Sequence, residues 1–155
     1  MIYLDNNATT PLADGVLEAM LPYLGGQFGN PSSYHRLGRE ARAAVEQARA
    51  DAAAALGAHP DEIVFTGGGT ESDNLALRGV IGARGGCGWH LIVSAVEHHA
   101  VLRTAQQLQR EGVAVTFLPV DGSGQVDPDE VRRALRPETA LVSVMAANNE
   151  TGVLQ

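Results

Sequence analysis

The stretch Thr66–Asn74, TGGGTESDN, follows directly on an apolar run at 62–65, EIVF. Three consecutive glycines permit backbone conformations that other residues avoid, and they let a ligand approach the main chain closely. Thr70 is a favourable helix N-cap residue, and Asp73, three positions later, completes a predicted capping box. The pattern therefore predicts a strand, a glycine turn and a helix that begins at Thr70.

The start of such a helix is a candidate phosphate site. Its unpaired backbone N–H groups and the positive end of the helix dipole both favour an anion. The ATP-type loop G-x-x-x-x-G-K-[ST] is excluded because all 11 basic residues are arginine and the chain contains no lysine. The motif alone is equally compatible with phosphate binding and with a tight, capped strand-to-helix turn.

Apolar strands and amphipathic helices alternate along the chain. We expect strands at 62–66, 90–94, 113–120 and 139–147, and helices at 11–24, 35–56, 70–84, 98–111 and 128–135. This alternation predicts an α/β fold, a mostly parallel sheet with helices on both faces. The 35–56 helix carries one apolar stripe, formed by Leu37, Ala41, Ala44, Val45, Ala48, Ala52 and Leu56.

Polar residues follow three of the expected strands. They are the turn 67–70, then Glu97 with His98 and His99, then 148–150 with the sequence NNE. Ligands of open α/β sheets bind beyond the carboxyl ends of the strands. The three clusters together therefore favour a binding site at this edge of the sheet.

A metal site is the alternative interpretation of Cys87, His90, His98 and His99. The strand 90–94 lies between the two pairs and separates them by roughly 15 Å at ~3.3 Å per residue. That distance is too long for ligands of one zinc ion. We therefore predict no metal site, and we expect Cys87 to take no part in the chemistry.

Composition narrows the class of protein further. The 155 residues can bury one ordinary core, and a net charge of -7 argues against nucleic acid or an anionic membrane as the main partner. A single cysteine excludes an internal disulfide and suits a reducing compartment. We found no apolar segment of membrane-spanning length and no signal peptide, so a cytoplasmic location is predicted.

Five motifs resemble those of the cysteine desulfurases, enzymes of the class V aminotransferase group that depend on pyridoxal 5'-phosphate (PLP). In family order, the motifs are YLDNNATTP (3–11), FGNPSSYH (28–35), EIVFTGGGTESDNLA (62–76), VEHHAVL (96–102) and NNETGV (148–153). The resemblance implies the large domain of a fold type I PLP-dependent transferase, incomplete in this chain. Residues 1–14 would form a rim of the active site, and 15–155 the first, truncated part of the PLP-binding domain.

The resemblance also assigns roles to individual residues. Gly69 and Thr70 match the turn that binds the PLP phosphate. His98 matches the histidine that stacks on the pyridine ring and assists proton transfer, which makes it the expected catalytic residue. Asn149 matches the asparagine that hydrogen-bonds the ring hydroxyl oxygen. Gly67 stands where the family usually has a serine or related residue, which removes one hydroxyl contact but keeps the turn.

The reaction implied by the resemblance takes sulfur from L-cysteine, leaving L-alanine and an enzyme persulfide. A sulfur-acceptor protein would then use the sulfur, for example in iron–sulfur cluster assembly, and the full-length enzyme would be a homodimer. The lysine that holds PLP and the nucleophilic cysteine would lie beyond the matched part, since Cys87 does not match the latter. The chain is therefore expected to be the first part of a longer protein and inactive alone. Another class V lyase, such as selenocysteine lyase, and a non-catalytic binding module or remnant remain alternatives.

Overall fold

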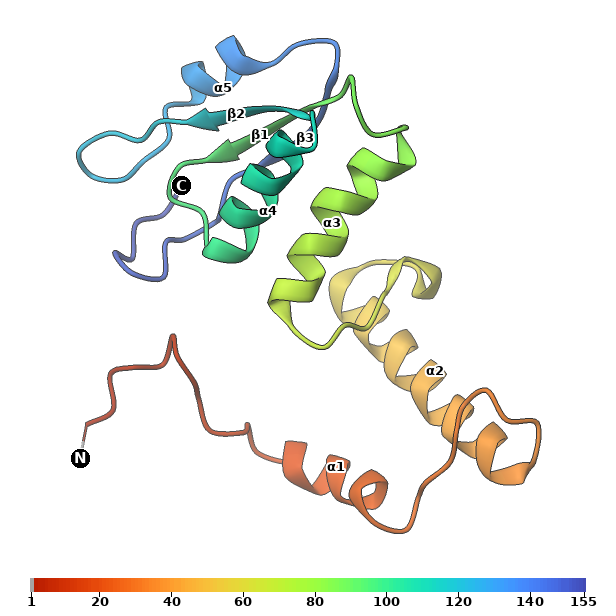
Figure 1. Ribbon diagram of the computed structural model, residues 1–155. Coiled ribbons are helices and arrows are strands. Elements are labelled where there is room, and N and C mark those ends of the chain that lie inside the picture. Colours follow the sequence, from red (N-terminus) through yellow and green to blue (C-terminus); the bar gives the residue numbers. More distant parts are fainter. Residues whose placement is uncertain (1) are drawn as a thin grey trace. The chain divides into compact units, whose positions relative to one another are not determined.

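The computed structural model describes residues 2–155 and divides the chain into two compact units, Met1–Phe65 and Thr66–Gln155 (Figure 1). Each unit has its own internal packing and is described separately.

The first unit contains two helices. Helix α1, Val16–Leu24, begins five residues later than predicted, because Gly15 at its N-cap adopts a left-handed conformation with φ 79°. Helix α2, Arg36–Leu56, agrees with the prediction and ends at Gly57, which is also left-handed with φ 66°. His35 caps α2, because its Nδ1 accepts a hydrogen bond from the Gly38 backbone N–H at 3.3 Å.

The loop before α2 packs closely on the first turn of that helix, and two glycines make this approach feasible. A Cβ on Gly38 would lie 2.3 Å from the Ser33 carbonyl oxygen, and a Cβ on Gly29 would lie 2.4 Å from the Leu37 carbonyl oxygen. The backbone of the FGNPSSYH motif thus lies against the first turn of α2, although most of its side chains are exposed.

The predicted strand at 62–66 is wrong. Pro60–Glu62 form a 3-10 turn, η1, and within residues 2–155 no strand pairs with the extended residues that follow. The Ile63 carbonyl instead accepts a hydrogen bond from the Arg49 guanidinium at 2.5 Å, and that guanidinium lies 5.1 Å from the centre of the Phe65 ring. A side chain therefore takes the place of a strand partner.

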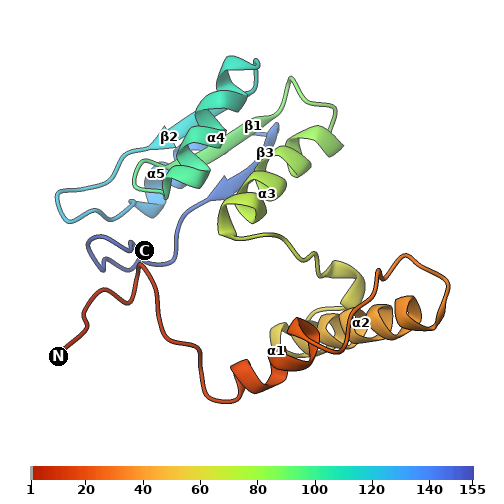
Figure 2. The ribbon, with the colours of Figure 1, turned by 60° about the horizontal axis from the view of Figure 1, so that its bottom comes forward.

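The second unit is a parallel sheet with helices. Its elements are α3 (Gly69–Ala83), β1 (His90–Ser94), α4 (His99–Arg110), β2 (Ala114–Leu118), α5 (Pro128–Ala134) and β3 (Thr139–Ser143). The strand order is β2-β1-β3, and both pairings are parallel (Figure 2). Three of the four predicted strands are confirmed, with β2 and β3 shorter than expected.

The core lies between the sheet and the helix pair α3 and α4. Leu77 and Ile81 of α3 and three residues of α4 (Val101, Ala105 and Leu108) cluster with Leu91 and Val93 of β1. All five residues of β1 are buried, on both of its faces. The β1-to-β2 and β2-to-β3 connections cross the sheet in opposite directions, so right-handed crossovers put α4 and α5 on opposite faces. The predicted fold class is confirmed.

His90 is a core residue and not part of a site. Its side chain is 1% exposed, and its two ring nitrogens hydrogen-bond Thr139 Oγ1 at 2.9 Å and Thr116 Oγ1 at 2.8 Å. Burial, together with the nearby Arg136, lowers the pKa of His90. A neutral imidazole therefore joins all three strands.

Candidate functional site

The glycine turn leads into α3, but Thr70 does not cap the helix. Gly68 occupies the N-cap position without a side-chain bond, and α3 begins at Gly69, so the predicted capping box of Thr70 and Asp73 is wrong. The turn is held instead by Glu71, whose Oε2 accepts from the Gly67 N–H at 2.7 Å. Within residues 2–155 no protein group hydrogen-bonds the Thr70 hydroxyl, so it is available to a ligand.

The backbone of this turn is open to a ligand. A Cβ built on Gly68 or on Gly69 would meet no atom within 4 Å. Gly68 has φ 159° and ψ 175°, a combination that essentially only glycine adopts. A ligand can thus reach the first N–H groups of α3, which have no partner within a helix.

His98 is the N-cap residue of α4. Its Nδ1 accepts a hydrogen bond from the Ala100 N–H at 3.1 Å, so the neutral ring carries its proton on Nε2. The side chain is exposed, and its ring centre lies 6.3 Å from that of His99. The cap fixes the orientation of an imidazole that a ligand can reach.

Thr70 and His98 line the same hollow, which lies between α3 and α4 and has a volume of about 420 Å³. Its lining residues are Thr70, Asn74, Arg78, His98, His99, Ala100, Arg103, Thr104 and Gln107. The Thr104 hydroxyl donates to Asn74 Oδ1 at 2.8 Å, and Asn74 Nδ2 donates to the Thr70 carbonyl at 2.8 Å. This chain of bonds connects the middle of α4, through Asn74, to the start of α3.

The hollow carries positive charge. Arg78 pairs with Glu111 at 3.2 Å, whereas Arg103 pairs with no carboxylate in the described part of the chain. Two helix N-termini, those of α3 and α4, add the positive ends of their dipoles. The electrostatics therefore favour an anionic ligand.

Asn149 does not line this hollow. It lies in the exposed turn 148–152, where its Nδ2 donates to Glu150 Oε1 at 3.1 Å. The turn is nevertheless tied to the segment before His98, because Asn148 Nδ2 donates to the Val96 carbonyl at 3.1 Å. The structure thus brings Gly69, Thr70 and His98 to one place and puts Asn149 on a turn bonded to the same region.

Glu97 is the residue whose importance the sequence did not reveal. It is 7% exposed, and its Oε1 accepts from the Met145 N–H at 2.6 Å and from the Ser94 hydroxyl at 3.3 Å. Burial raises the pKa of Glu97, although these two hydrogen bonds act in the opposite direction. The sequence placed Glu97 among the polar residues after β1 but could not show that it is buried.

The residues weighed as metal ligands are dispersed in the structure. Within residues 2–155, no group of three or more His, Cys, Asp or Glu side chains is arranged to hold a metal ion. Cys87 is exposed, and its Sγ lies 3.5 Å from the Glu111 carbonyl oxygen.

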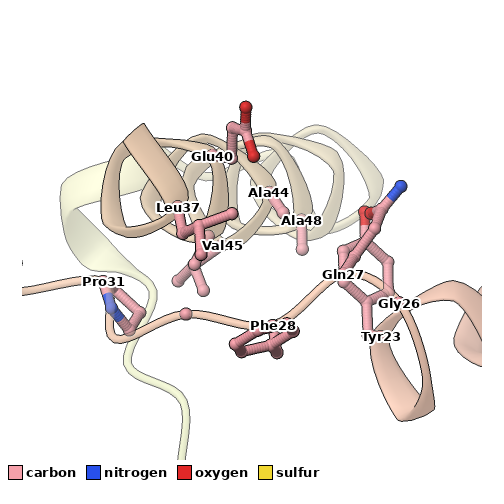
Figure 3. Close-up of a pocket in the computed structure, with 12 residues that line it drawn as sticks. Tyr23, Gly26, Gln27, Phe28, Pro31, Leu37, Glu40, Ala44, Val45 and Ala48 are labelled. Carbon is pink, nitrogen blue, oxygen red and sulfur yellow. The ribbon is translucent and has the colours of Figure 1, made fainter. Parts of the chain in front are cut away.

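A second hollow, in the first unit, is apolar. It has a volume of about 700 Å³ and lies between the loop containing Phe28 and the predicted stripe of α2, with Leu37, Val45 and Ala48 on the helix side (Figure 3). Most of its lining is hydrocarbon, and the carboxylate of Glu40, another lining residue, points away from Phe28 (Figure 3). No chemistry is assigned to it.

Comparison with known proteins identifies the family. The family model described as Aminotransferase class-V matches residues 2–155. The chain therefore belongs to the class-V aminotransferase family.

Its relatives within that family include cysteine desulfurases. The chain is 54% identical to the cysteine desulfurase IscS of Dictyoglomus turgidum over 154 residues, which are 99% of this chain and 39% of the relative. It is 53% identical to the IscS of Methanosarcina thermophila, with 99% and 38% covered. The chain thus spans about two fifths of the length of these curated relatives.

Solved structures share the fold. A NifS-like protein, 42% identical, superposes with a TM-score of 0.90 over 97% of this chain and 41% of that one. A structure described as SspA in complex with cysteine, 44% identical, superposes with a TM-score of 0.87 over 96% and 43%.

Proposed function

We propose that these residues form the phosphate-binding and ring-facing side of the active site of a PLP-dependent cysteine desulfurase. The observation that carries the proposal is that Thr70 and His98, far apart in sequence, line one hollow between α3 and α4, and each lies at the N-terminus of its helix. The similarity to cysteine desulfurases over 99% of the chain supports the same reaction.

The residues present fit PLP. Its phosphate needs donors without competing partners, and the turn supplies the open N–H groups of α3 and the unbonded Thr70 hydroxyl. Its planar ring needs a flat contact, and the capped imidazole of His98 provides one at the rim of the same hollow.

Each residue then has a distinct task. The Gly69 N–H and the Thr70 hydroxyl would donate to phosphate oxygens, and the His98 ring would contact the PLP ring while its Nε2 serves as a proton donor and acceptor. The amide of Asn149 would hydrogen-bond the ring hydroxyl oxygen. When bound, PLP withdraws electrons from the carbon that carries the substrate amino group.

L-cysteine is the proposed substrate, and L-alanine and a protein persulfide are the proposed products. The 155 residues contain no lysine to hold PLP, and Cys87 is hydrogen-bonded to the Glu111 backbone, away from the lining of the hollow. We therefore propose that these residues do not turn over cysteine by themselves and act with groups supplied from elsewhere.

The remaining assignments extend the same proposal. The complete protein is proposed to act as a cytoplasmic homodimer that passes sulfur to an acceptor protein, including for iron–sulfur cluster assembly. Residues 1–14 would lie at the rim of the active site and 15–155 within the PLP-binding domain. Within residues 2–155 no helix combines the length and apolarity needed to cross a membrane.

The test compares His98→Asn with the unmodified complete protein in an assay of alanine formed from L-cysteine. Asparagine is a good N-cap residue, so the variant keeps the bond to Ala100 and loses only the ring. We expect turnover to fall by roughly 10²-fold or more, the usual contribution of a positioned acid–base group. The thermal midpoint should stay unchanged.

Two outcomes would overturn the proposal. Unaltered turnover in His98→Asn would remove His98 from the chemistry. An unmodified protein that releases alanine from L-selenocysteine but not from L-cysteine would be a selenocysteine lyase instead.

A further inference from the structure

Two segments that carry proposed site residues are bonded to each other directly beside those residues. Glu97 immediately precedes His98, and Asn148 immediately precedes Asn149. Each of these two side chains reaches across to the backbone of the other segment. The pair connects the carboxyl end of β1 with the chain that follows β3.

The first connection is made by the Glu97 carboxylate. Its Oε1 accepts from the Met145 N–H, two residues beyond β3, at 2.6 Å. The same oxygen accepts from the hydroxyl of Ser94, the last residue of β1, at 3.3 Å. A carboxylate that accepts from a backbone N–H forms one of the stronger hydrogen bonds in proteins.

The second connection is made by the Asn148 side chain and runs in the opposite direction. Its Nδ2 donates to the Val96 carbonyl at 3.1 Å. Its Oδ1 accepts from the N–H groups of Glu150 and Thr151, both at 2.9 Å. One amide therefore both shapes the turn that contains Asn149 and attaches that turn to the residue two positions before His98.

The burial of Glu97 carries a desolvation cost. The side chain is 7% exposed, and burial raises its pKa. A buried polar group is tolerated only when it is hydrogen-bonded. Its two partners, Ser94 and Met145, belong to the strand ends that lead to His98 and Asn149.

We propose that Glu97 and Asn148 act as a two-way clamp that fixes the position of His98 relative to Asn149. They are positioning residues, since the groups they bond are backbone and neighbouring side chains. The inference rests on the proposed PLP site, because that site gives His98 and Asn149 a shared ligand. With the clamp in place, the ring contact of His98 and the hydrogen bond of Asn149 would both reach the same bound PLP ring without a rearrangement of either segment.

The test uses three substitutions in the complete PLP-loaded protein. Asn148→Asp keeps the Oδ1 that shapes the turn and removes the donor to Val96. Glu97→Ala removes the acceptor for Met145, and Glu97→Gln restores an acceptor without the charge. Thr116→Val is the matched control, because it removes one hydrogen bond of the same sheet, to His90 at the other end of β1.

We expect kcat to fall roughly tenfold or more in Asn148→Asp and Glu97→Ala, as for other small misplacements of reacting groups, with KM for L-cysteine nearly unchanged. The visible circular dichroism of bound PLP should change with them, because it reports the orientation of the ring. Glu97→Gln should recover most of kcat, and Thr116→Val should match the unmodified protein. A lower thermal midpoint in Asn148→Asp and Glu97→Ala with unchanged kcat and dichroism would show that the pair is merely structural and overturn the clamp.

A second readout separates failure of the clamp from failure of the proposed function. Hydrogen exchange at the Ala100 N–H, which bonds to His98, needs no PLP. Faster exchange in Asn148→Asp than in Thr116→Val supports the clamp even if PLP does not bind, in which case the proposed function alone fails. Equal exchange rates in Asn148→Asp and Thr116→Val would overturn the clamp. This comparison does not use Glu97→Ala, so it remains decisive if that variant fails to fold.

Discussion

At the scale of single residues, the Thr70 hydroxyl lies at a helix start without capping it, which gives Thr70→Ala a specific expected effect. The loss of one hydrogen bond to a charged phosphate, worth about 1.5–3 kcal/mol, should weaken PLP binding by about tenfold or more. Stability should change little, because no protein group bonds the hydroxyl within residues 2–155. Equilibrium titration with PLP and a thermal melt measure the two effects.

Ser72→Ala is the matched control for Thr70→Ala. Its hydroxyl lies 2.6 Å from that of Thr66 in the same turn but does not line the hollow. This variant should lose some stability and keep its affinity for PLP. Equal affinity in Thr70→Ala and Ser72→Ala would contradict the phosphate assignment.

Glu97 should make stability depend on pH. Burial raises its folded-state pKa above the unfolded value, so the folded state binds the proton more tightly than the unfolded state does. Its contribution is therefore most favourable below the unfolded pKa of about 4.3 and decreases as pH rises through the raised folded pKa. In Glu97→Gln this decrease in stability should be absent. Denaturant unfolding at a series of pH values, from below the unfolded pKa to above the raised folded pKa, measures the difference. An identical pH profile in the variant would mean that Glu97 is not the group responsible.

The sequence predicted which residues gather at the site but not how they are bonded. The turn 67–70 and the His98 segment were expected at one edge of the sheet, and Thr70 and His98 share a hollow. The capping box was wrong by two positions, since the N-cap of α3 is Gly68 and not Thr70. Burial of Glu97 depends on the packing of β1 against β3, which no local pattern encodes.

At the scale of elements, the start of α2 depends on Gly38. An alanine inside a helix usually stabilises it relative to glycine by about 0.5–1 kcal/mol. At Gly38 the added Cβ would lie 2.3 Å from the Ser33 carbonyl oxygen, so Gly38→Ala should instead destabilise the protein by about 1–3 kcal/mol. Chemical denaturation of the complete protein measures the difference.

Gly79→Ala, in the middle of α3, serves as the control because its Cβ would meet nothing within 4 Å. It should stabilise the protein by the ordinary helix preference of about 0.5–1 kcal/mol. Equal effects of the two substitutions would show that the loop before α2 can yield without cost.

Helices were easier to predict than strands. The helix periodicity of residues 36–56 and the glycine that follows are both local, and α2 ends where they indicate. The apolar run 62–65 has strand composition, but a strand exists only when another backbone pairs with it. Here Arg49 bonds the Ile63 carbonyl instead, and this contact comes from a residue 14 positions earlier.

At the scale of the whole molecule, the backbone amides best protected from hydrogen exchange should be those of β1. It is hydrogen-bonded on both edges, and Leu91, Ile92 and Val93 are fully buried. Amides of β1 should exchange more slowly than those of β2, which begins at an exposed Ala114. Hydrogen–deuterium exchange by mass spectrometry resolves the two peptides, and equal rates would contradict the central role of β1.

The fold class followed from the alternation of strands and helices, whereas the strand order did not. The local sequence of residues 113–120 and 139–147 does not specify that both strands pair with β1 and not with each other. That choice depends on crossover handedness and on which faces α4 and α5 cover. It belongs to tertiary structure.

The β2-β1-β3 order has a consequence for how the chain assembles during synthesis. The β2 partner of His90 is Ala114 and its β3 partner is Thr139, which is about twice as far along the chain. Local pairings close smaller loops and form earlier. A nascent chain can therefore build β1, α4 and β2 as a seed on the ribosome, with the carboxyl end of β1 left open until β3 emerges. The Glu97 contact with Met145 would then be among the last to form, so the site would be completed only when the sheet is.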